Sequence, residues 1–164
     1  MSKPVNTHGT CIALSCAEHR SGVLLQGAPG SGKSSLALQL IDRPGFGAGS
    51  AQPVCGQLVS DDQVLLENID GGLTASAPGA ISGLLEVRGT GIIKVEQTSS
   101  PVRLDMVIVH ADAADMDRLP APAVIDLCDR TLPLHKIDFA TPSAAAQVRT
   151  LALIGWRLLS LSNS

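Results

Sequence analysis

One stretch of eight residues constrains this chain more than any other. Residues 27–34 read Gly-Ala-Pro-Gly-Ser-Gly-Lys-Ser and match the pattern G-x-x-x-x-G-K-[ST] at every position. The pattern predicts an apolar strand before them, over residues 22–26, and an amphipathic helix after them, over residues 34–41. Glycines let the backbone amides of such a loop turn towards phosphate oxygens, and the helix directs its positive end at the same anion. The motif therefore predicts a nucleoside triphosphate site.

Two side chains of the loop have specific roles in this interpretation. Lys33 would bring positive charge to the terminal phosphates, and the hydroxyl of Ser34 would ligate Mg²⁺. The alternative is a chance glycine-rich turn before a helix, but the flanking elements favour the phosphate loop. The residues predicted to bind the nucleotide here are Gly27, Ala28, Pro29, Gly30, Ser31, Gly32, Lys33, Ser34 and Ser35.

Composition excludes several other classes of function. The 164 residues are 45% hydrophobic but include only two Phe, one Trp and no Tyr, so the core must be aliphatic and base-stacking modules are disfavoured. The net charge of −3 offers no basic surface for nucleic acid or an anionic membrane. The first residues do not predict a secretory signal, and no apolar run approaches the ~18 residues of a membrane span. We expect a single domain over residues 1–164 in the cytoplasm, with no nucleic acid and no membrane as partner.

The order of elements indicates an α/β protein with a mixed sheet rather than a regular alternation of strands and helices. A mobile, glycine-rich surface loop is expected over residues 45–56. A second helix is predicted over residues 143–161, after Thr141-Pro142. Besides residues 22–26, strands are predicted over residues 10–14, 57–59, 64–67, 103–110 and 132–139.

Phosphoryl transfer also needs a carboxylate for the metal and a group that handles the acceptor. Asp61 and Asp62 follow an apolar strand, 28 residues after Lys33. Adjacent carboxylates can divide this work: one accepts a proton from the attacking hydroxyl, and the other orients the metal or a nearby histidine. A solvated acidic turn is the alternative. Glu86 is a further acid, although a Glu beside Arg88 is more often half of a surface ion pair.

His8 precedes the strand predicted over residues 10–14. If that strand forms a hairpin with residues 22–26, we expect His8 near the phosphate loop only if the connection is longer than residues 17–21 suggest. A lone histidine is more often structural or exposed, so the residues alone leave both interpretations open.

Four segments together resemble the catalytic domain of HPr kinase/phosphorylase, the protein-serine kinase of the bacterial phosphotransferase system. They occur in the family's order and spacing within residues 8–95. The last one resembles the family signature Leu-Glu-Ile-Arg-Gly-Leu-Gly-Ile-Ile-x-Val and is the most specific. The segments are His8-Gly9-Thr10, the loop and helix of residues 27–41, Val59-Ser60-Asp61-Asp62-Gln63-Val64, and Leu85-Glu86-Val87-Arg88-Gly89-Thr90-Gly91-Ile92-Ile93-Lys94-Val95.

The resemblance implies a P-loop α/β domain similar to phosphoenolpyruvate carboxykinase. It also implies transfer of the γ-phosphoryl group of ATP to a serine of the carrier HPr. By position, Asp61 would be the general base in this direction and the acid in the reverse direction. Asp62 would support Asp61, the metal or His8, and the resemblance raises His8 to a catalytic candidate. Further implied roles are Mg²⁺ placement by Ser34 and Glu86, charge neutralisation by Lys33, and phosphate binding by Arg88.

This sequence departs from the family pattern in two places. Family members have an N-terminal domain, whereas seven residues precede His8 here, so we expect the short, stand-alone form of some proteobacteria. Its partner would be an HPr-like carrier of a sugar or nitrogen-related phosphotransferase branch. The family's Phe-Gly-Ala-Gly segment is replaced by residues 96–101. This replacement weakens the expectation of phosphorolysis and of binding to standard HPr. A homo-oligomer is compatible with the resemblance, but the family's hexamer is not required.

Two other functions use the same motif. A small-molecule kinase would have a closed pocket beside Asp61 instead of an open face. A nucleotide-dependent switch or binding module would keep Lys33 and Ser34 but displace Asp61 or His8.

Overall fold

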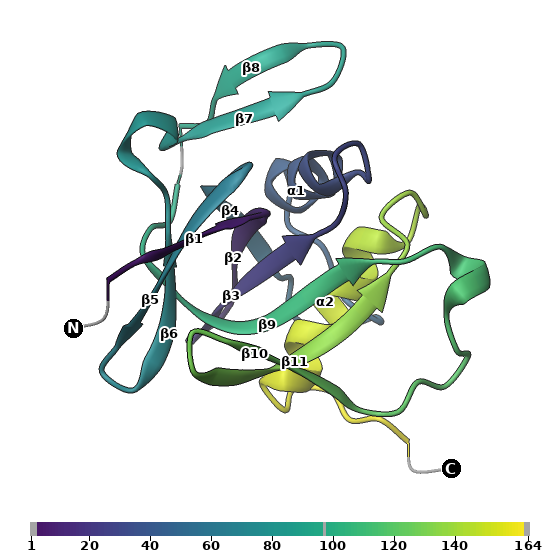
Figure 1. Ribbon diagram of the computed structural model, residues 1–164. Coiled ribbons are helices and arrows are strands. Elements are labelled where there is room, and N and C mark those ends of the chain that lie inside the picture. Colours follow the sequence, from purple (N-terminus) through teal and green to yellow (C-terminus); the bar gives the residue numbers. More distant parts are fainter. Residues whose placement is uncertain (1–2, 97, 163–164) are drawn as a thin grey trace.

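The computed structural model describes residues 3–96 and 98–162 and places a mixed sheet at the centre of the molecule (Figure 1). Nine strands form this sheet, and β7 with β8 forms a separate hairpin. The strands are β1 Val5–His8, β2 Thr10–Cys16, β3 His19–Gln26, β4 Cys55–Ser60, β5 Gln63–Ile69, β6 Gly72–Ser76, β7 Leu84–Val87, β8 Gly91–Lys94, β9 Val102–His110, β10 Ala123–Leu127 and β11 Arg130–Ile137. The helices are α1 Lys33–Asp42 and α2 Ala144–Gly155, with short 3₁₀ turns at Gly79–Ile81 and Ala113–Asp115.

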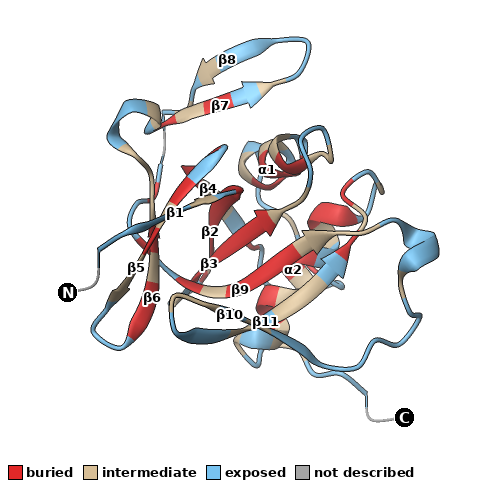
Figure 2. Cartoon of the chain, in the orientation of Figure 1, coloured by how far each residue is buried: buried red, intermediate tan, exposed pale blue. Residues whose placement is uncertain are grey.

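The central strands β2, β3 and β9 are buried on both faces (Figure 2). On one face, Ile12, Val23 and Ile108 pack with both helices in one aliphatic cluster. On the other face, Leu24 and Val107 pack with strands β5 and β6, which curl over the sheet. This three-layer arrangement explains why these strands read as nearly continuous apolar runs.

The chain crosses between the two strand layers at two corners that lie together. One corner is Gly9, between β1 and β2, and the other is Asp61-Asp62, between β4 and β5. The Gly9 amide donates a hydrogen bond to the Asp62 carbonyl, 3.0 Å away. A Cβ at Gly9 would lie 2.9 Å from the Leu25 carbonyl oxygen, so the first corner requires glycine. The corners therefore bring residues from distant parts of the sequence to the end of β3, where the phosphate loop begins.

The predicted α/β class and mixed sheet are confirmed, since β9 is parallel to β3 and β11 while β2 is antiparallel to β3. All six predicted strands are present, with longer bounds in most cases. The predictions missed β1, β6 and β10 and did not resolve the β7–β8 hairpin. These missed strands are short or mostly exposed, so their apolar pattern is weak.

Two predicted elements differ from the structure. The second helix ends at Gly155 rather than near residue 161, because Arg157 adopts a left-handed conformation with a φ of +62° and the Leu158 amide turns back to the Leu153 carbonyl at 2.8 Å. The indole of Trp156 stacks on His19 and donates to the Ser21 hydroxyl. The loop predicted over residues 45–56 ends earlier, since Cys55 already begins β4. Its two ends are joined by paired hydrogen bonds between Gly45 and Val54.

The part of the chain that the structure describes has no helix long and apolar enough to cross a membrane.

The two helices are tied together by Arg149 of α2. Its guanidinium is buried and donates hydrogen bonds to the carbonyl oxygens of Gln39 and Arg43, 3.3 and 3.0 Å away at the end of α1. Burial, and secondarily the charge of Arg43, lowers the pKa of Arg149 from its usual value. This contact satisfies carbonyls that the helix end leaves without partners. Arg149 thus fixes the end of α1 opposite to the phosphate loop.

We expect Arg149→Met to destabilise the fold by about 1–2 kcal/mol, because the carbonyls at the end of α1 lose a charged donor while the buried stem is retained. Urea denaturation measures the difference. Arg157→Met, at an exposed position, is the matched control and should lie within about 0.5 kcal/mol of the wild type. Equal midpoints for both variants would contradict a structural role for the Arg149 contacts.

Candidate active site

The phosphate loop lies between β3 and α1, and its own backbone holds its lysine. Lys33 is 7% exposed, and its Nζ donates hydrogen bonds to the carbonyl oxygens of Gly27 and Ala28 at 2.8 and 3.1 Å. Gly30 and Gly32 have positive φ angles of 81° and 101°, which L-residues rarely adopt. The loop is therefore shaped by its glycines, with the ammonium group held at its inner side.

A cavity of about 340 Å³ opens beside the loop and α1. Most of the predicted nucleotide and metal residues line it, together with Leu38 and Val87, which the sequence did not single out. Four predicted loop residues do not line the cavity, namely Gly27, Ala28, Pro29 and Ser31. Gly27 and Ala28 hold Lys33, and the buried Ser31 hydroxyl has no hydrogen-bond partner in the part of the chain that the structure describes. The predicted residues that line it are Gly30, Gly32, Lys33, Ser34, Ser35, Glu86 and Arg88.

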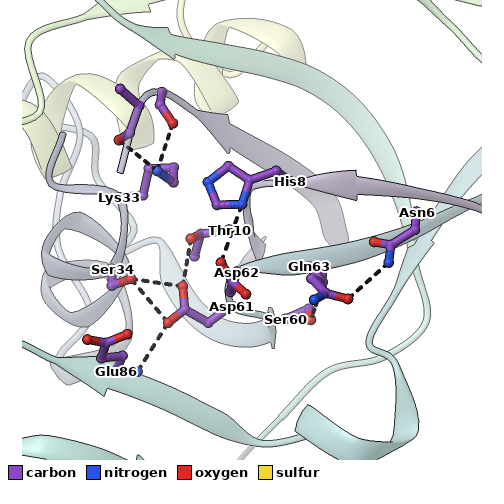
Figure 3. Close-up of polar contacts among 12 residues, drawn as sticks. Asn6, His8, Thr10, Lys33, Ser34, Ser60, Asp61, Asp62, Gln63 and Glu86 are labelled. Atoms are coloured by element: carbon purple, nitrogen blue, oxygen red, sulfur yellow. Dashed lines mark hydrogen bonds and ion pairs between the residues drawn. The ribbon is translucent and has the colours of Figure 1, made fainter. Parts of the chain in front are cut away.

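Asp61 is the polar centre of the site (Figure 3). Its side chain is buried, with 6% of the residue exposed, and accepts hydrogen bonds from three elements. The Thr10 hydroxyl of β2 donates to Oδ1 at 2.7 Å, and the Ser34 hydroxyl of α1 lies 2.9 Å from Oδ1 and 3.1 Å from Oδ2. The Glu86 amide of β7 donates to Oδ2 at 3.1 Å. Ser34 and Asp61, which the sequence indicated as separate site residues, are thus in direct contact.

Asp62 points the other way, towards His8 (Figure 3). Its Oδ1 lies 3.3 Å from His8 Nδ1, and the two side chains are 67% and 50% exposed. Asp62 has a φ of +70°, a left-handed conformation that aspartate tolerates better than most residues. The tight corner therefore directs two adjacent carboxylates to different surroundings, one buried and one open to solvent.

His8 lies at the phosphate-loop end for a reason that the sequence interpretation missed. The connection between β2 and β3 is a turn of only two residues, Ala17 and Glu18. The expectation that a longer connection was needed is wrong, because antiparallel pairing of Thr10 with Leu25 already brings the start of β2 beside the end of β3. The alternative of a solvated acidic turn also fails for Asp61, which is buried.

Glu86 and Arg88 lie on and just after β7, which forms one wall of the cavity. No ion pair joins them within residues 3–96 and 98–162, so the surface-pair alternative is not supported. Arg88 Nη2 lies 3.5 Å from the point that a Cβ on Gly30 would occupy, over the phosphate loop. Glu86 and Arg88 thus both line the cavity from the β7–β8 hairpin.

The oxygen groups of this site suit a Mg²⁺ ion that is bound together with nucleotide phosphates. They do not form a metal site made of protein ligands alone. The described residues contain no cluster of three or more His, Cys, Asp or Glu suited to a metal ion. Mg²⁺ is commonly held by one or two carboxylates together with substrate phosphates. Ser34 and Glu86 line the cavity with a hydroxyl and a carboxylate, and Asp61 adds a second carboxylate in contact with Ser34.

The predictions did not identify Thr10 as a site residue, although it stands two positions after His8. Its signal was weak, because a threonine at the start of an apolar strand is ordinary in any sheet. Residues 96–101, which replace a family segment, include Gln97, which lies outside the described residues. The Ser99 amide donates to the Leu58 carbonyl at 2.9 Å, so Thr98 and Ser99 lie beside β4.

Comparison with known proteins gives this site its context. Residues 1–108 match the family described as HPr Serine kinase C-terminal domain. The HPr kinase/phosphorylase of Clostridium tetani is 45% identical over 107 residues, which cover 60% of this chain and 32% of that protein. The enzyme of the same name from Clostridium beijerinckii is 38% identical over 121 residues, covering 68% of this chain and 35% of that protein. The chain spans about a third of the length of these relatives.

The solved structure of the Hpr(Ser) kinase/phosphatase from Coxiella burnetii has the same fold. It superposes with a TM-score of 0.75 at 23% identity and covers 94% of this chain and 97% of that one. The P-loop α/β fold expected from the sequence is thus confirmed. With the family match extending over residues 1–108, this chain belongs to the HPr serine kinase C-terminal domain family.

Proposed function

We propose that this protein transfers the γ-phosphoryl group of ATP to a serine of an HPr-like carrier protein. The observation that carries the proposal is the arrangement at the corner: an exposed His8–Asp62 pair beside a buried Asp61 that contacts Ser34 of the phosphate loop. A nucleotide bound by the loop would have its terminal phosphate near both carboxylates. The family match and the relatives named HPr kinase/phosphorylase support the same reaction.

In this reaction the serine Oγ forms a bond to the γ-phosphorus while the bond to the β-phosphate oxygen breaks, and ADP leaves. Backbone amides of the loop, Lys33 and Arg88 would bind the phosphates and balance their charge. In such transfers most of the acceleration comes from positioning and electrostatic stabilisation. The serine proton needs an acceptor that the carrier can reach.

The contacts favour Asp62 over Asp61 as this acceptor. Asp61 already accepts three donors and is buried, whereas Asp62 is exposed and oriented by His8. A general base must come within hydrogen-bond distance of the proton that it removes. The assignment of the base to Asp61 stays a prediction, and the substitutions described below separate the two assignments.

We propose that Ser34, Asp61 and Glu86 hold Mg²⁺ together with the nucleotide phosphates. The ion would neutralise charge that develops on the phosphate oxygens. Of these residues, Ser34 already donates to Asp61, so the hydroxyl oxygen keeps lone pairs for a cation. Glu86 contributes its backbone to Asp61 and its side chain to the cavity wall.

The exposure of His8 and Asp62 favours a protein substrate over a small molecule. A small-molecule kinase encloses its acceptor, but here the pair lies open at the edge of the site. A carrier of a sugar or nitrogen-related phosphotransferase branch would present its serine to this open face, and we place the reaction in the cytoplasm with such carriers. The contact between Ser34 and Asp61 argues against a switch that has lost its catalytic arrangement.

The direct test incubates the protein with labelled ATP, Mg²⁺ and the purified HPr-like carriers of its source, and maps the modified residue by mass spectrometry. We expect phosphoserine on one carrier. Tight binding of Mg-ATP without transfer to any carrier would instead favour a nucleotide-dependent binding module.

We expect Asp62→Asn to lower kcat by about 10²–10⁴-fold while Mg-ATP affinity stays near that of the wild type, because the proton acceptor is lost but the loop is intact. Asp61→Asn should weaken Mg-ATP binding in calorimetry as well as transfer. The reverse pattern, with normal Mg-ATP affinity in Asp61→Asn and near-normal transfer in Asp62→Asn, would return the base to Asp61.

Lys33→Ala should weaken Mg-ATP binding by about 10–100-fold, because a charged donor to the phosphates is removed. Isothermal titration calorimetry measures this. Lys3→Ala, at an exposed position before β1, serves as the control for loss of one positive charge. An unchanged affinity in Lys33→Ala would refute the phosphate-loop interpretation.

A further inference from the structure

Thr10 is a buried hydroxyl aimed at the buried carboxylate of the site. The residue is fully buried at the start of β2, and its Oγ1 donates to Asp61 Oδ1 at 2.7 Å. This is the shortest of the contacts made to Asp61, since those of Ser34 and the Glu86 amide measure 2.9–3.1 Å. Figure 3 shows the Thr10 hydroxyl and the Ser34 hydroxyl approaching the same carboxylate. Hydrogen bonds of this kind, with one charged partner, are the stronger ones in proteins.

The other two donors belong to the walls of the nucleotide cavity. The Ser34 hydroxyl is the loop group that would ligate a metal ion, and Glu86 lies on β7, which forms one wall of the cavity. The Ser34 hydroxyl therefore has a second partner to satisfy when nucleotide and metal are bound, and the Glu86 amide belongs to a residue whose carboxylate would turn to the metal. Thr10 does not line the cavity, and among residues 3–96 and 98–162 its hydroxyl has no hydrogen-bond partner other than Asp61. Its contact with Asp61 is the one that ligand binding does not need to rearrange.

The position of Thr10 is itself rigidly fixed. β2 lies between β3 and β4, with Thr10 opposite Leu25 and Cys11 opposite Ser60. The preceding Gly9 amide is bonded to the Asp62 carbonyl at 3.0 Å, which ties β2 to the corner carrying Asp61. The branched Thr10 side chain has few rotamers, so its hydroxyl loses little entropy in making this bond. Such a donor can fix the orientation of a carboxylate to within a small angle.

We propose that Thr10 is a positioning residue for the metal side of the site. Its hydroxyl holds Oδ1 of Asp61 and so fixes the plane of the carboxylate, which faces Ser34 and the cation associated with the nucleotide. The inference rests on the proposed nucleotide site and names a residue that acts through Asp61. Its effect should therefore appear in the Mg²⁺-dependent part of nucleotide binding rather than in phosphate binding as such.

The test compares ATP affinity with Mg²⁺ and with excess EDTA for wild type and Thr10→Val, which keeps the side-chain shape but removes the hydroxyl. We expect Thr10→Val to weaken Mg-ATP binding by about tenfold and to leave metal-free ATP binding unchanged. Thr10→Ser, which restores a hydroxyl, should recover most of the loss. Thr74→Val makes the same substitution on β6, away from the site, and should change neither affinity.

A purely structural threonine gives a different result. In that case Thr10→Val lowers the thermal midpoint of unfolding, or it weakens ATP binding equally with Mg²⁺ and with EDTA. The ratio of the two ATP affinities then equals that of the wild type. This outcome overturns the inference while the proposed function stands. If the wild type binds no Mg-ATP at all, the proposed function fails, and the inference fails with it.

A second measurement uses the wild-type protein and does not depend on how the variants fold. A hydroxyl proton held by a buried carboxylate exchanges slowly enough to be seen by NMR. We expect the Thr10 hydroxyl resonance in the free protein and its persistence when Mg²⁺ and a non-hydrolysable ATP analogue are added. Loss of the resonance on nucleotide binding, with the complex formed, would show that Thr10 releases Asp61 and would overturn the inference.

Discussion

The rest of the site depends on the hydrogen bonds that the buried carboxylate of Asp61 accepts. A buried charge is costly unless hydrogen bonds compensate for its lost hydration, and three donors do so here. Each donor comes from a different element: β2, α1 and the β7–β8 hairpin. Because one small group must satisfy all three, the strand, the phosphate loop and the hairpin have little freedom to move independently while Asp61 stays charged.

The corner that carries Asp61 follows from the layered fold. A sheet buried on both faces needs covering layers, and strands β5 and β6 supply one by curling back over the centre (Figure 1). The chain turns sharply at two of the places where it passes between layers, Gly9 and Asp61-Asp62. Sharp corners expose side chains that regular strands would hide, which is why polar residues gather there. The end of β3 lies beside both corners, and so the phosphate loop joins them.

The same geometry gives two neighbouring carboxylates unlike surroundings. Asp61 faces inward to the loop and Asp62 faces outward to His8, and the left-handed backbone of Asp62 produces this divergence. A pair separated in this way can serve metal and proton acceptor at once without the repulsion of two carboxylates sharing one pocket. The hairpin of Glu86 and Arg88 closes the opposite side, so the cavity is bordered by elements that all meet at Asp61.

Sequence alone determined the phosphate loop, the helix after it, the mixed α/β class and the buried strands, because each of these is written locally in glycine positions or apolar periodicity. It also singled out Asp61, Asp62 and Glu86 as acids worth attention, and the family resemblance connected them with His8. Strand pairing in the tertiary structure decided the rest. The hairpin with its two-residue turn brings His8 to the phosphate loop, and the corner buries Asp61 while leaving Asp62 open to solvent. The same packing makes the Thr10 hydroxyl and the Glu86 amide hydrogen-bond donors to Asp61. The contacts of Thr10 and of the Glu86 amide with Asp61 join residues 51 and 25 positions apart, and no local pattern records them. They arise only when the strands find their register and the two corners come together.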